Sequence, residues 1–225
     1  MWLMMWACTQ SIKDSASQSA NDDLNPETQY TATIKLYDAF TGQALSGIDV
    51  LGNLADSPST TDETGQATTT VTSSYHIEMA SEGYPTHHYM GQADVDFELI
   101  ALLANESTST QVYTMLGITQ NPSNGVLVVA LDKPDLSPAV GASASIDANM
   151  SQAFVLGNTG PSYGTTVTSS SSSVVTFPDL APGEVTVTAI NASGEPCISF
   201  PSGNGSDQQV TVFGGAVTVA VYTCQ

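Results

Sequence analysis

The stretch of residues 174–189 restricts the fold of this chain more than any other. Its second half alternates apolar and polar side chains, because threonines separate Val185, Val187 and Ala189. Alternation with a period of two is typical of a β-strand that buries one face. A turn rich in proline and glycine separates this strand from an earlier apolar segment. We therefore predict a β-sandwich hairpin over residues 174–189.

The same period occurs near the start of the chain. Over residues 30–37 the apolar Ala32, Ile34 and Leu36 alternate with polar residues, which predicts another half-buried strand. Closing strands are expected between residues 95 and 113, through Phe97, Leu99, Ala101 and Leu103.

These segments resemble the carboxypeptidase-regulatory-like domains, a family of transthyretin-like β-sandwiches. Residues 177–189 are similar to the family pattern F-x-x-L-x-P-G-x-V-T-V-x-A, and residues 38–50 to D-x-x-T-G-x-x-L-x-G-x-x-V. Residues 61–65 resemble its T-D-x-x-G turn, and residues 75–84 its strand ending in G-Y. The turn glycines would take backbone angles that are costly for other residues. Because such modules are usually accessory, the resemblance implies a fold and no particular activity.

A second copy of the pattern begins at Gly125, after a polar, proline-containing boundary at residues 117–124. In this copy the serine run 169–173 is expected to form a flexible loop, and two strands around Gly214-Gly215 a final hairpin. The predicted fold is all-β, with two consecutive antiparallel β-sandwich domains after a short disordered N-terminal tether. The predicted divisions are residues 1–27, 28–117 and 122–225.

The chain begins with a short apolar run, residues 1–7, followed by Cys8. The run is too short to cross a bilayer and lacks a positively charged start, so we expect the start codon to lie upstream. Residues 5–8, Met-Trp-Ala-Cys, resemble a bacterial lipobox. This resemblance implies lipid attachment at Cys8 and a place in the cell envelope, at the outer membrane or the cell surface. The alternative is a chance cysteine after an apolar start.

Two further cysteines, Cys197 and Cys224, lie in the second half. Lipidation of Cys8 would leave them as the only two free thiols, and export would allow them to pair. We therefore predict a disulfide between them. The alternative is two buried, unpaired thiols, as expected of a cytosolic protein.

The charge of the chain limits its partners. Its formal net charge is -19, and Lys13, Lys35 and Lys133 are its only basic residues apart from histidine. Such a surface repels a phosphate backbone, and the chain has no arginine to read base edges, so we predict no nucleic-acid partner.

One motif is typical of a hydrolase. Residues 160–164 match the G-x-S-x-G pattern, which places a nucleophilic serine, here Ser162, between a strand and a helix. A β-type segment follows instead, and no histidine occurs after Ser162 to complete a triad. We interpret the match as chance loop composition.

Two groups of residues could bind metals. His76 and Glu78 would share a strand face, with His87 and His88 in a nearby loop, which is a conceivable zinc site. We favour a solvent-facing strand pair, because Ile77 and Met79 would occupy the inner face of the strand. Likewise, we interpret three carboxylates as solvated surface and not as a calcium site, because no calcium-loop motif accompanies them. They are Asp94, Asp96 and Glu98, which we expect on one strand face.

The function predicted from these observations is that of a non-catalytic, exported, lipid-anchored surface protein with a binding or structural and adhesive role. No catalytic residue, metal or cofactor is predicted. An alternative is an accessory module that binds a glycan, a peptide or a protein, and a remote alternative is a hydrolase. Exposed aromatic side chains on one face would favour the glycan-binding alternative. The candidates for such a face are Phe40, Tyr84, Tyr89 and Tyr163.

Overall fold

The computed structural model describes residues 28–149, 152–200 and 207–225, which form sixteen strands and one helix. Cys8 and the predicted tether lie outside these residues. The first half contains β1 Tyr30–Asp38, β2 Asp49–Gly52, β3 Ser59–Thr60, β4 Gln66–Val71, β5 Ser74–Ser81, β6 Tyr84–Gln92, β7 Phe97–Leu103 and the helix α1 Glu106–Leu116. The second half contains β8 Gly125–Asp132, β9 Ser143–Ile146, β10 Phe154–Gly157, β11 Gly160–Tyr163, β12 Val174–Leu180, β13 Gly183–Ile190, β14 Ile198–Ser199, β15 Asp207–Val212 and β16 Val217–Thr223.

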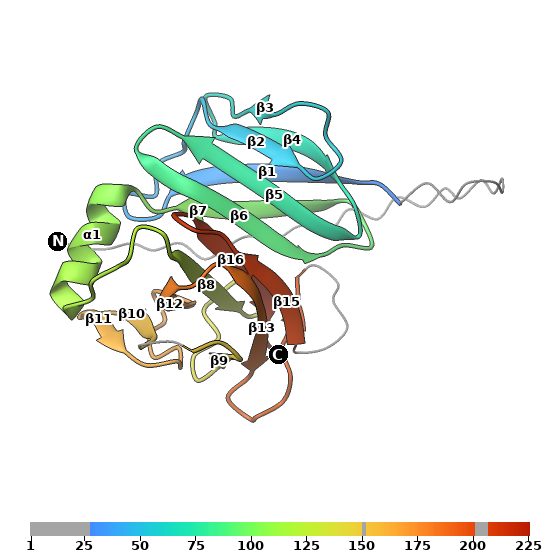
Figure 1. Cartoon of the computed structure of the whole chain (residues 1–225). Coiled ribbons are helices and arrows are strands. Elements are labelled where there is room, and N and C mark those ends of the chain that lie inside the picture. The colour runs from blue at the N-terminus through green and yellow to red at the C-terminus, as the bar shows by residue number, and fades with distance from the viewer. Residues whose placement is uncertain (1–27, 150–151, 201–206) are drawn as a thin grey trace.

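One ten-stranded sheet runs through both halves of the molecule. Its order is β11-β10-β12-β8-β16-β6-β5-β2-β3, and β14 pairs with β16 outside this path. The last strand, β16, lies between β6 and β8 and is parallel to both (Figure 1). Two three-stranded sheets complete the fold, with the orders β4-β1-β7 and β15-β13-β9. The C-terminal strand therefore joins the two halves through backbone hydrogen bonds.

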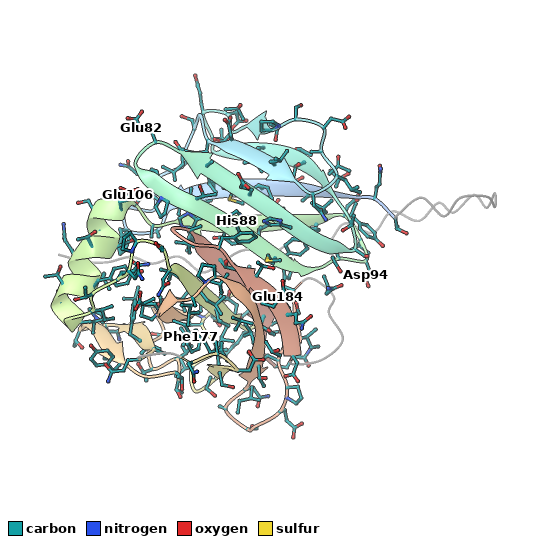
Figure 2. All side chains as sticks on the ribbon, viewed as in Figure 1. Glu82, His88, Asp94, Glu106, Phe177 and Glu184 are labelled. Atoms are coloured by element: carbon teal, nitrogen blue, oxygen red, sulfur yellow. A yellow bond between two sulfur atoms is a disulfide. The ribbon has the colours of Figure 1, made fainter. Side chains whose placement is uncertain are left out.

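Two hydrophobic cores lie on opposite faces of the large sheet. Consecutive residues of β8 contribute to different cores, because Val126 and Ala130 pack in the first core and Leu127 and Val129 in the second. The sheet β4-β1-β7 supplies the first core, and β15-β13-β9 the second. Figure 2 shows Phe177 within the second half. A strand covered on both faces reads as a continuous apolar run, which explains the composition of β8.

The predicted all-β sandwich is confirmed. The apolar face of β1 is fully buried, and the four apolar residues expected near residue 100 are buried along β7. The turn glycines Gly42, Gly47 and Gly65 have φ angles of 67°, 76° and 77°, in the left-handed region where other residues are strained. The sheets are not wholly antiparallel, because β1 is parallel to β7, and β16 to β6 and β8.

Both predicted hairpins of the second half are wrong. β12 pairs with β8 and β10, whereas β13 pairs with β9 and β15. Phe177 of β12 and Val187 of β13 belong to the same core, so the two strands face each other across it. β15 and β16, which flank Gly214-Gly215, likewise lie in different sheets. Alternation reports that a strand buries one face but not which strand it pairs with, so a hairpin and a crossing between sheets have the same pattern.

The segment after β7 was also expected to be a strand, but it forms the helix α1. The side chain of Asn105 caps the helix by accepting a hydrogen bond from the Thr108 backbone N–H at 2.9 Å. Gly117 ends it in the left-handed conformation, with φ 66°. An asparagine before the first turn and a glycine after the last are helix boundary signals that could have been found in the sequence. Among the described residues, no helix is both long and apolar enough to cross a bilayer.

The serine run is irregular, as expected, but it is packed against the protein. Ser169, Ser172 and Ser173 are buried. The hydroxyls of Ser169 and Ser171 both donate to the Asn158 side-chain oxygen at 2.6 Å. Local hydrogen bonds therefore organise this segment in place of a regular turn.

The division of the chain into residues 28–117 and 122–225 stays a prediction. Because β16 pairs with β6, we expect fragments cut at this boundary to bind each other when they are expressed together, and to co-purify. Val219→Asp should abolish this association, because it places a charge in the shared core. Gln209→Asp, on an exposed position of β15, should not. Separate elution of the two unsubstituted fragments would contradict the expectation.

Candidate functional site

An apolar cavity of about 120 Å³ lies between α1 and the large sheet. Strands of both halves line it, because β6 contributes Tyr89, and β8 and β16 contribute Val128 and Val217. From the helix, Val112 and Tyr113 close the other side.

The helix above the cavity is held at its two ends. At its start, the Asn105 amide donates to the Asp38 carboxylate at 3.3 Å, and at its end the Tyr163 hydroxyl donates to the Leu116 carbonyl. Between these points Val112 and the other residues of α1 stay partly exposed, so that no helix residue is buried. The helix thus covers the cavity without packing tightly on the sheet.

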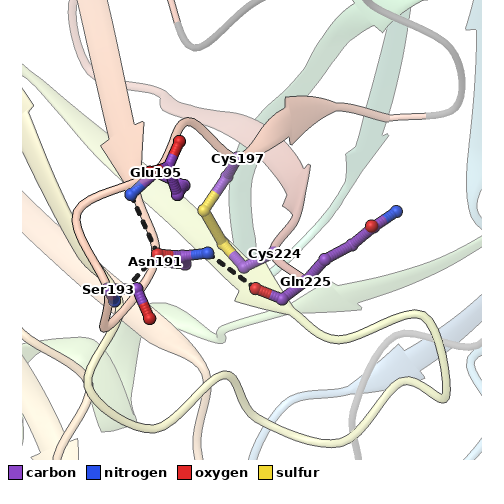
Figure 3. Close-up of a disulfide and its surroundings, with 6 residues drawn as sticks. All are labelled: Asn191, Ser193, Glu195, Cys197, Cys224 and Gln225. Atoms are coloured by element: carbon purple, nitrogen blue, oxygen red, sulfur yellow. Dashed lines mark hydrogen bonds between the residues drawn. A yellow bond between two sulfur atoms is a disulfide. The ribbon is translucent and has the colours of Figure 1, made fainter.

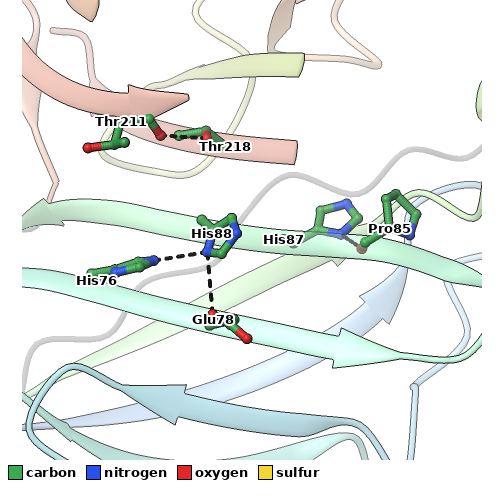
Figure 4. A network of polar contacts seen from close by, with 7 residues as sticks. All are labelled: His76, Glu78, Pro85, His87, His88, Thr211 and Thr218. Atoms are coloured by element: carbon green, nitrogen blue, oxygen red, sulfur yellow. Dashed lines mark hydrogen bonds and ion pairs between the residues drawn. The ribbon is translucent and has the colours of Figure 1, made fainter. Parts of the chain in front are cut away.

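Two polar side chains in the cavity wall have their hydrogen bonds satisfied by the backbone. The Tyr89 hydroxyl donates to the Leu102 carbonyl at 3.1 Å and accepts from the Leu102 N–H at 2.8 Å. The Nδ1 atom of His87 lies 2.7 Å from the Pro85 carbonyl (Figure 4). Its Nε2 atom lies 3.4 Å from the Ala104 nitrogen. Burial lowers the pKa of His87 to about 4, so this side chain is neutral at pH 7. No charged side chain is among the described residues that line the cavity.

A second hollow, a polar cleft of about 430 Å³, lies beside β5, β6 and β15. It is lined by hydroxyl, amide and carboxylate groups, among them Ser74, Gln92, Glu184, Gln208 and Thr211. Several of these groups bind each other, since Gln92 contacts Ser74 at 3.1 Å and the Thr211 hydroxyl donates to Glu184 at 2.7 Å. The cleft therefore offers polar groups suited to a hydroxyl-rich or peptide ligand.

A histidine pair lies next to this cleft, on the face of the sheet opposite to the first core. The Nε2 atom of His76 lies 2.9 Å from Nδ1 of His88, and Glu78 is 3.9 Å from the same Nδ1 atom (Figure 4). The Phe213 ring lies 4.0 Å from the His88 ring, centroid to centroid. Burial lowers the pKa of His76, and that of His88 to about 4.

This arrangement corrects part of the sequence interpretation. His76 and Glu78 share a strand face as expected, but His87 and His88 lie within β6 and are buried, and are not in a loop. Within the described ranges, no three His, Cys, Asp or Glu side chains are grouped so that they could hold a metal ion.

The carboxylates considered for calcium are dispersed along the start of β7. Asp96 precedes the strand and accepts a hydrogen bond from the Thr31 N–H at 2.7 Å, while Glu98 pairs with Lys35 at 2.8 Å. Asp94 is exposed at the edge of the molecule (Figure 2). The expected single strand face with three carboxylates is therefore wrong.

Ser162 lies on the edge strand β11, at one end of the large sheet, and is exposed. The three histidines of the chain lie on β5 and β6, several strands away. The structure therefore does not bring a histidine to the serine of the G-x-S-x-G match.

The aromatic candidates do not gather on one face. Phe40 and Tyr89 line the apolar cavity, and the Tyr84 hydroxyl donates to Asp38 at 2.9 Å. Tyr163 alone of the four is among the exposed large hydrophobic residues, at 47 %.

The structure contains the predicted disulfide between Cys197 and Cys224, whose Cα atoms are 4.4 Å apart (Figure 3). The turn beside it is organised by Asn191, whose side-chain oxygen accepts from the Ser193 and Glu195 N–H groups at 2.8 and 3.0 Å. The Asn191 amide also donates to the Gln225 carbonyl at 2.7 Å. The end of the chain is thus attached by a covalent bond and by hydrogen bonding.

Sequence reasoning missed a buried carboxylate, Asp132, at the end of β8. Neither of its oxygens has a hydrogen-bond partner in the described part of the chain, and the Ser172 hydroxyl also lacks one. Burial raises the pKa of Asp132 to about 7, and the nearby Ser173 hydroxyl lowers it by less. The sequence signal that could have revealed this buried carboxylate is its position, because Asp132 directly follows the apolar run of β8.

The corresponding aspartate of the first half, Asp38 at the end of β1, is in a different state. Burial alone would raise its pKa, but hydrogen bonds from Thr41, Tyr84 and Phe40 outweigh burial and lower it. The two strand ends therefore hold one satisfied and one unsatisfied carboxylate.

Scans against protein-family models and curated protein sequences find no match for this chain. Among solved structures, the Bacillus anthracis TIE protein is similar, with 12 % identity over 87 % of this chain and 33 % of that chain, at a TM-score of 0.27. The minor pilin of Streptococcus agalactiae has 12 % identity over 86 % of this chain and 95 % of its own length, at a TM-score of 0.28. A shaft pilin from Lactobacillus rhamnosus GG has 10 % identity over 87 % of this chain and 98 % of its own, at 0.25. This chain spans only a third of the TIE protein and 62 % of a streptococcal ancillary pilin. At these TM-scores the likenesses carry no functional argument.

Proposed function

We propose that this chain is a non-catalytic, exported protein of the cell envelope that is lipid-anchored through Cys8 and has a structural or binding role. The observation that carries the proposal is the disulfide between Cys197 and Cys224. Disulfides persist in oxidising compartments and are rare in the cytosol, so this bond favours export. The net charge of -19 favours partners other than nucleic acid.

The continuous sheet supports a structural role. Because β16 is hydrogen-bonded to both β6 and β8, the two halves share a ladder and cannot rotate about a single connection. A rigid body of this kind suits a surface protein that holds a binding region away from the membrane.

Replacing Cys8 by alanine is expected to move the protein made in its native host from the detergent phase to the aqueous phase in a partitioning experiment. A lipidated cysteine carries the two or more acyl chains that stable anchoring needs. The Cys197→Ala/Cys224→Ala variant is the matched control and should stay in the detergent phase. If wild type and Cys8→Ala partition alike, Cys8 is not the anchor.

The alternative function, an accessory module for a glycan or peptide, is supported by the polar cleft. Its groups already contact one another, so a ligand would have to replace those contacts. Titration with oligosaccharides and with short peptides, followed by amide chemical shifts, tests it. Shift changes near Gln92 that Gln92→Ala abolishes would favour this function over a purely structural one.

A further inference from the structure

We propose that the cavity beneath α1 is a binding site for one small, uncharged, hydrocarbon-rich molecule of about the size of a benzene or toluene ring. The inference concerns the interior of the folded chain, so it stands whether or not Cys8 anchors the protein.

The chemistry of the cavity wall selects an uncharged ligand. Tyr89 and His87, two polar side chains of the wall, direct their polar atoms to backbone groups of the protein itself. The described lining residues include no charged side chain, so a charged ligand would lose its water without gaining an opposite charge, which is unfavourable. Aliphatic side chains such as Val128 and Val174 make up most of the remaining wall. Apolar cavities of this kind stay dry and take up apolar molecules.

The volume limits the size of the ligand. The cavity measures about 120 Å³, and an engineered apolar cavity of about 150 Å³ holds one benzene molecule. One aromatic ring or a short branched aliphatic molecule therefore fits, whereas a sugar or a complete acyl chain does not fit inside.

The position of the cavity shows what a bound molecule would do. Tyr89 belongs to the first half, Val217 to the second, and Val112 to the helix between them. The residues of α1 are only partly buried, so a ligand would add contacts between the helix and the sheet. We expect it to stabilise the helix and the junction of the two halves together.

Thermal unfolding of the full chain with benzene or toluene tests the proposal. At a free ligand concentration ten times Kd, the Tm of the wild type should rise by about 4 °C. Ala130→Leu places a larger side chain in the cavity wall and should abolish this rise. Ala192→Leu, the same change at an exposed position, should retain it. If Ala130→Leu does not fold, Val112→Phe fills the cavity from the partly exposed helix and serves the same purpose.

Two further measurements locate the site. Toluene should change the amide chemical shifts of residues around the cavity, such as Val128 and Val217, and benzylammonium, a ring of similar size with a charge, should not bind. An unchanged Tm of the wild type, a Tm rise that survives both filling variants, or shift changes confined to other parts of the protein would each overturn the proposal.

Discussion

The Asp132→Asn variant is expected to be more stable than the wild type by about 4 kcal/mol at pH 8. Burial raises the pKa of Asp132 from its ordinary value of 3.8 to about 7. Each pKa unit corresponds to about 1.4 kcal/mol between the two protonation states. In the folded chain this carboxyl binds a proton that the unfolded chain has already released, so stability falls as pH rises from about 4 to about 7. Asparagine has no charge to bury and avoids the loss.

The pH dependence separates this mechanism from a general effect on packing. The advantage of Asp132→Asn should shrink by about 1.4 kcal/mol for each pH unit below 7 and approach zero near pH 4. At pH 8 it should raise Tm by roughly 10 °C. Asp135→Asn is the matched control, because Asp135 is exposed and hydrogen bonds from Ser137 lower its pKa. It should not stabilise the chain at pH 8. An advantage of Asp132→Asn that stays constant from pH 5 to pH 8 would contradict the prediction.

The Cys197→Ala/Cys224→Ala variant is expected to lose roughly 3 to 4 kcal/mol of stability. The cysteines are 27 residues apart in sequence, and closing a loop of this length removes about that much free energy from the unfolded state in the chain-entropy description. The bond also holds the end of β16, where the Cys224 N–H donates to the Asp132 carbonyl at 2.7 Å. Because β16 belongs to both halves, we expect one transition at lower denaturant for the whole chain.

Urea unfolding under oxidising conditions measures this loss. The reduced wild type should unfold at the same urea concentration as the double variant, and the double variant should not respond to reductant. Cys8→Ala, which keeps the bond, should unfold like the oxidised wild type. Coincident transitions of the oxidised wild type and the double variant would show that the bond adds no stability.

Local sequence patterns predicted which residue types matter in the candidate sites, but they predicted little of where these residues lie in the fold. The cysteine count led to the disulfide, and the strand period placed His76 and Glu78 on one face. The position of His88 in a strand was missed, because the run Tyr84 to Gln92 does not alternate apolar and polar side chains in the usual way. The cavity has no signature in the sequence, because its wall combines residues from Ala39 to Val219.

The amino-acid sequence by itself determined strands such as β1, β7 and β13, and where many of the turns lie. In β1 and β13 successive side chains point to opposite faces, so alternation along the sequence is enough to predict the strand. At Gly65 the turn needs a positive φ angle, which the residue type alone indicates. Only the tertiary structure decided which strands pair. β12 and β13 cross between sheets, and β16 joins the two halves, because strand pairing and core packing are contacts between residues that lie far apart in the chain. The same long-range packing buried Asp132 without a hydrogen-bond partner for its carboxylate oxygens among the described residues. Its pKa depends on what surrounds it in space and not on its neighbours in sequence.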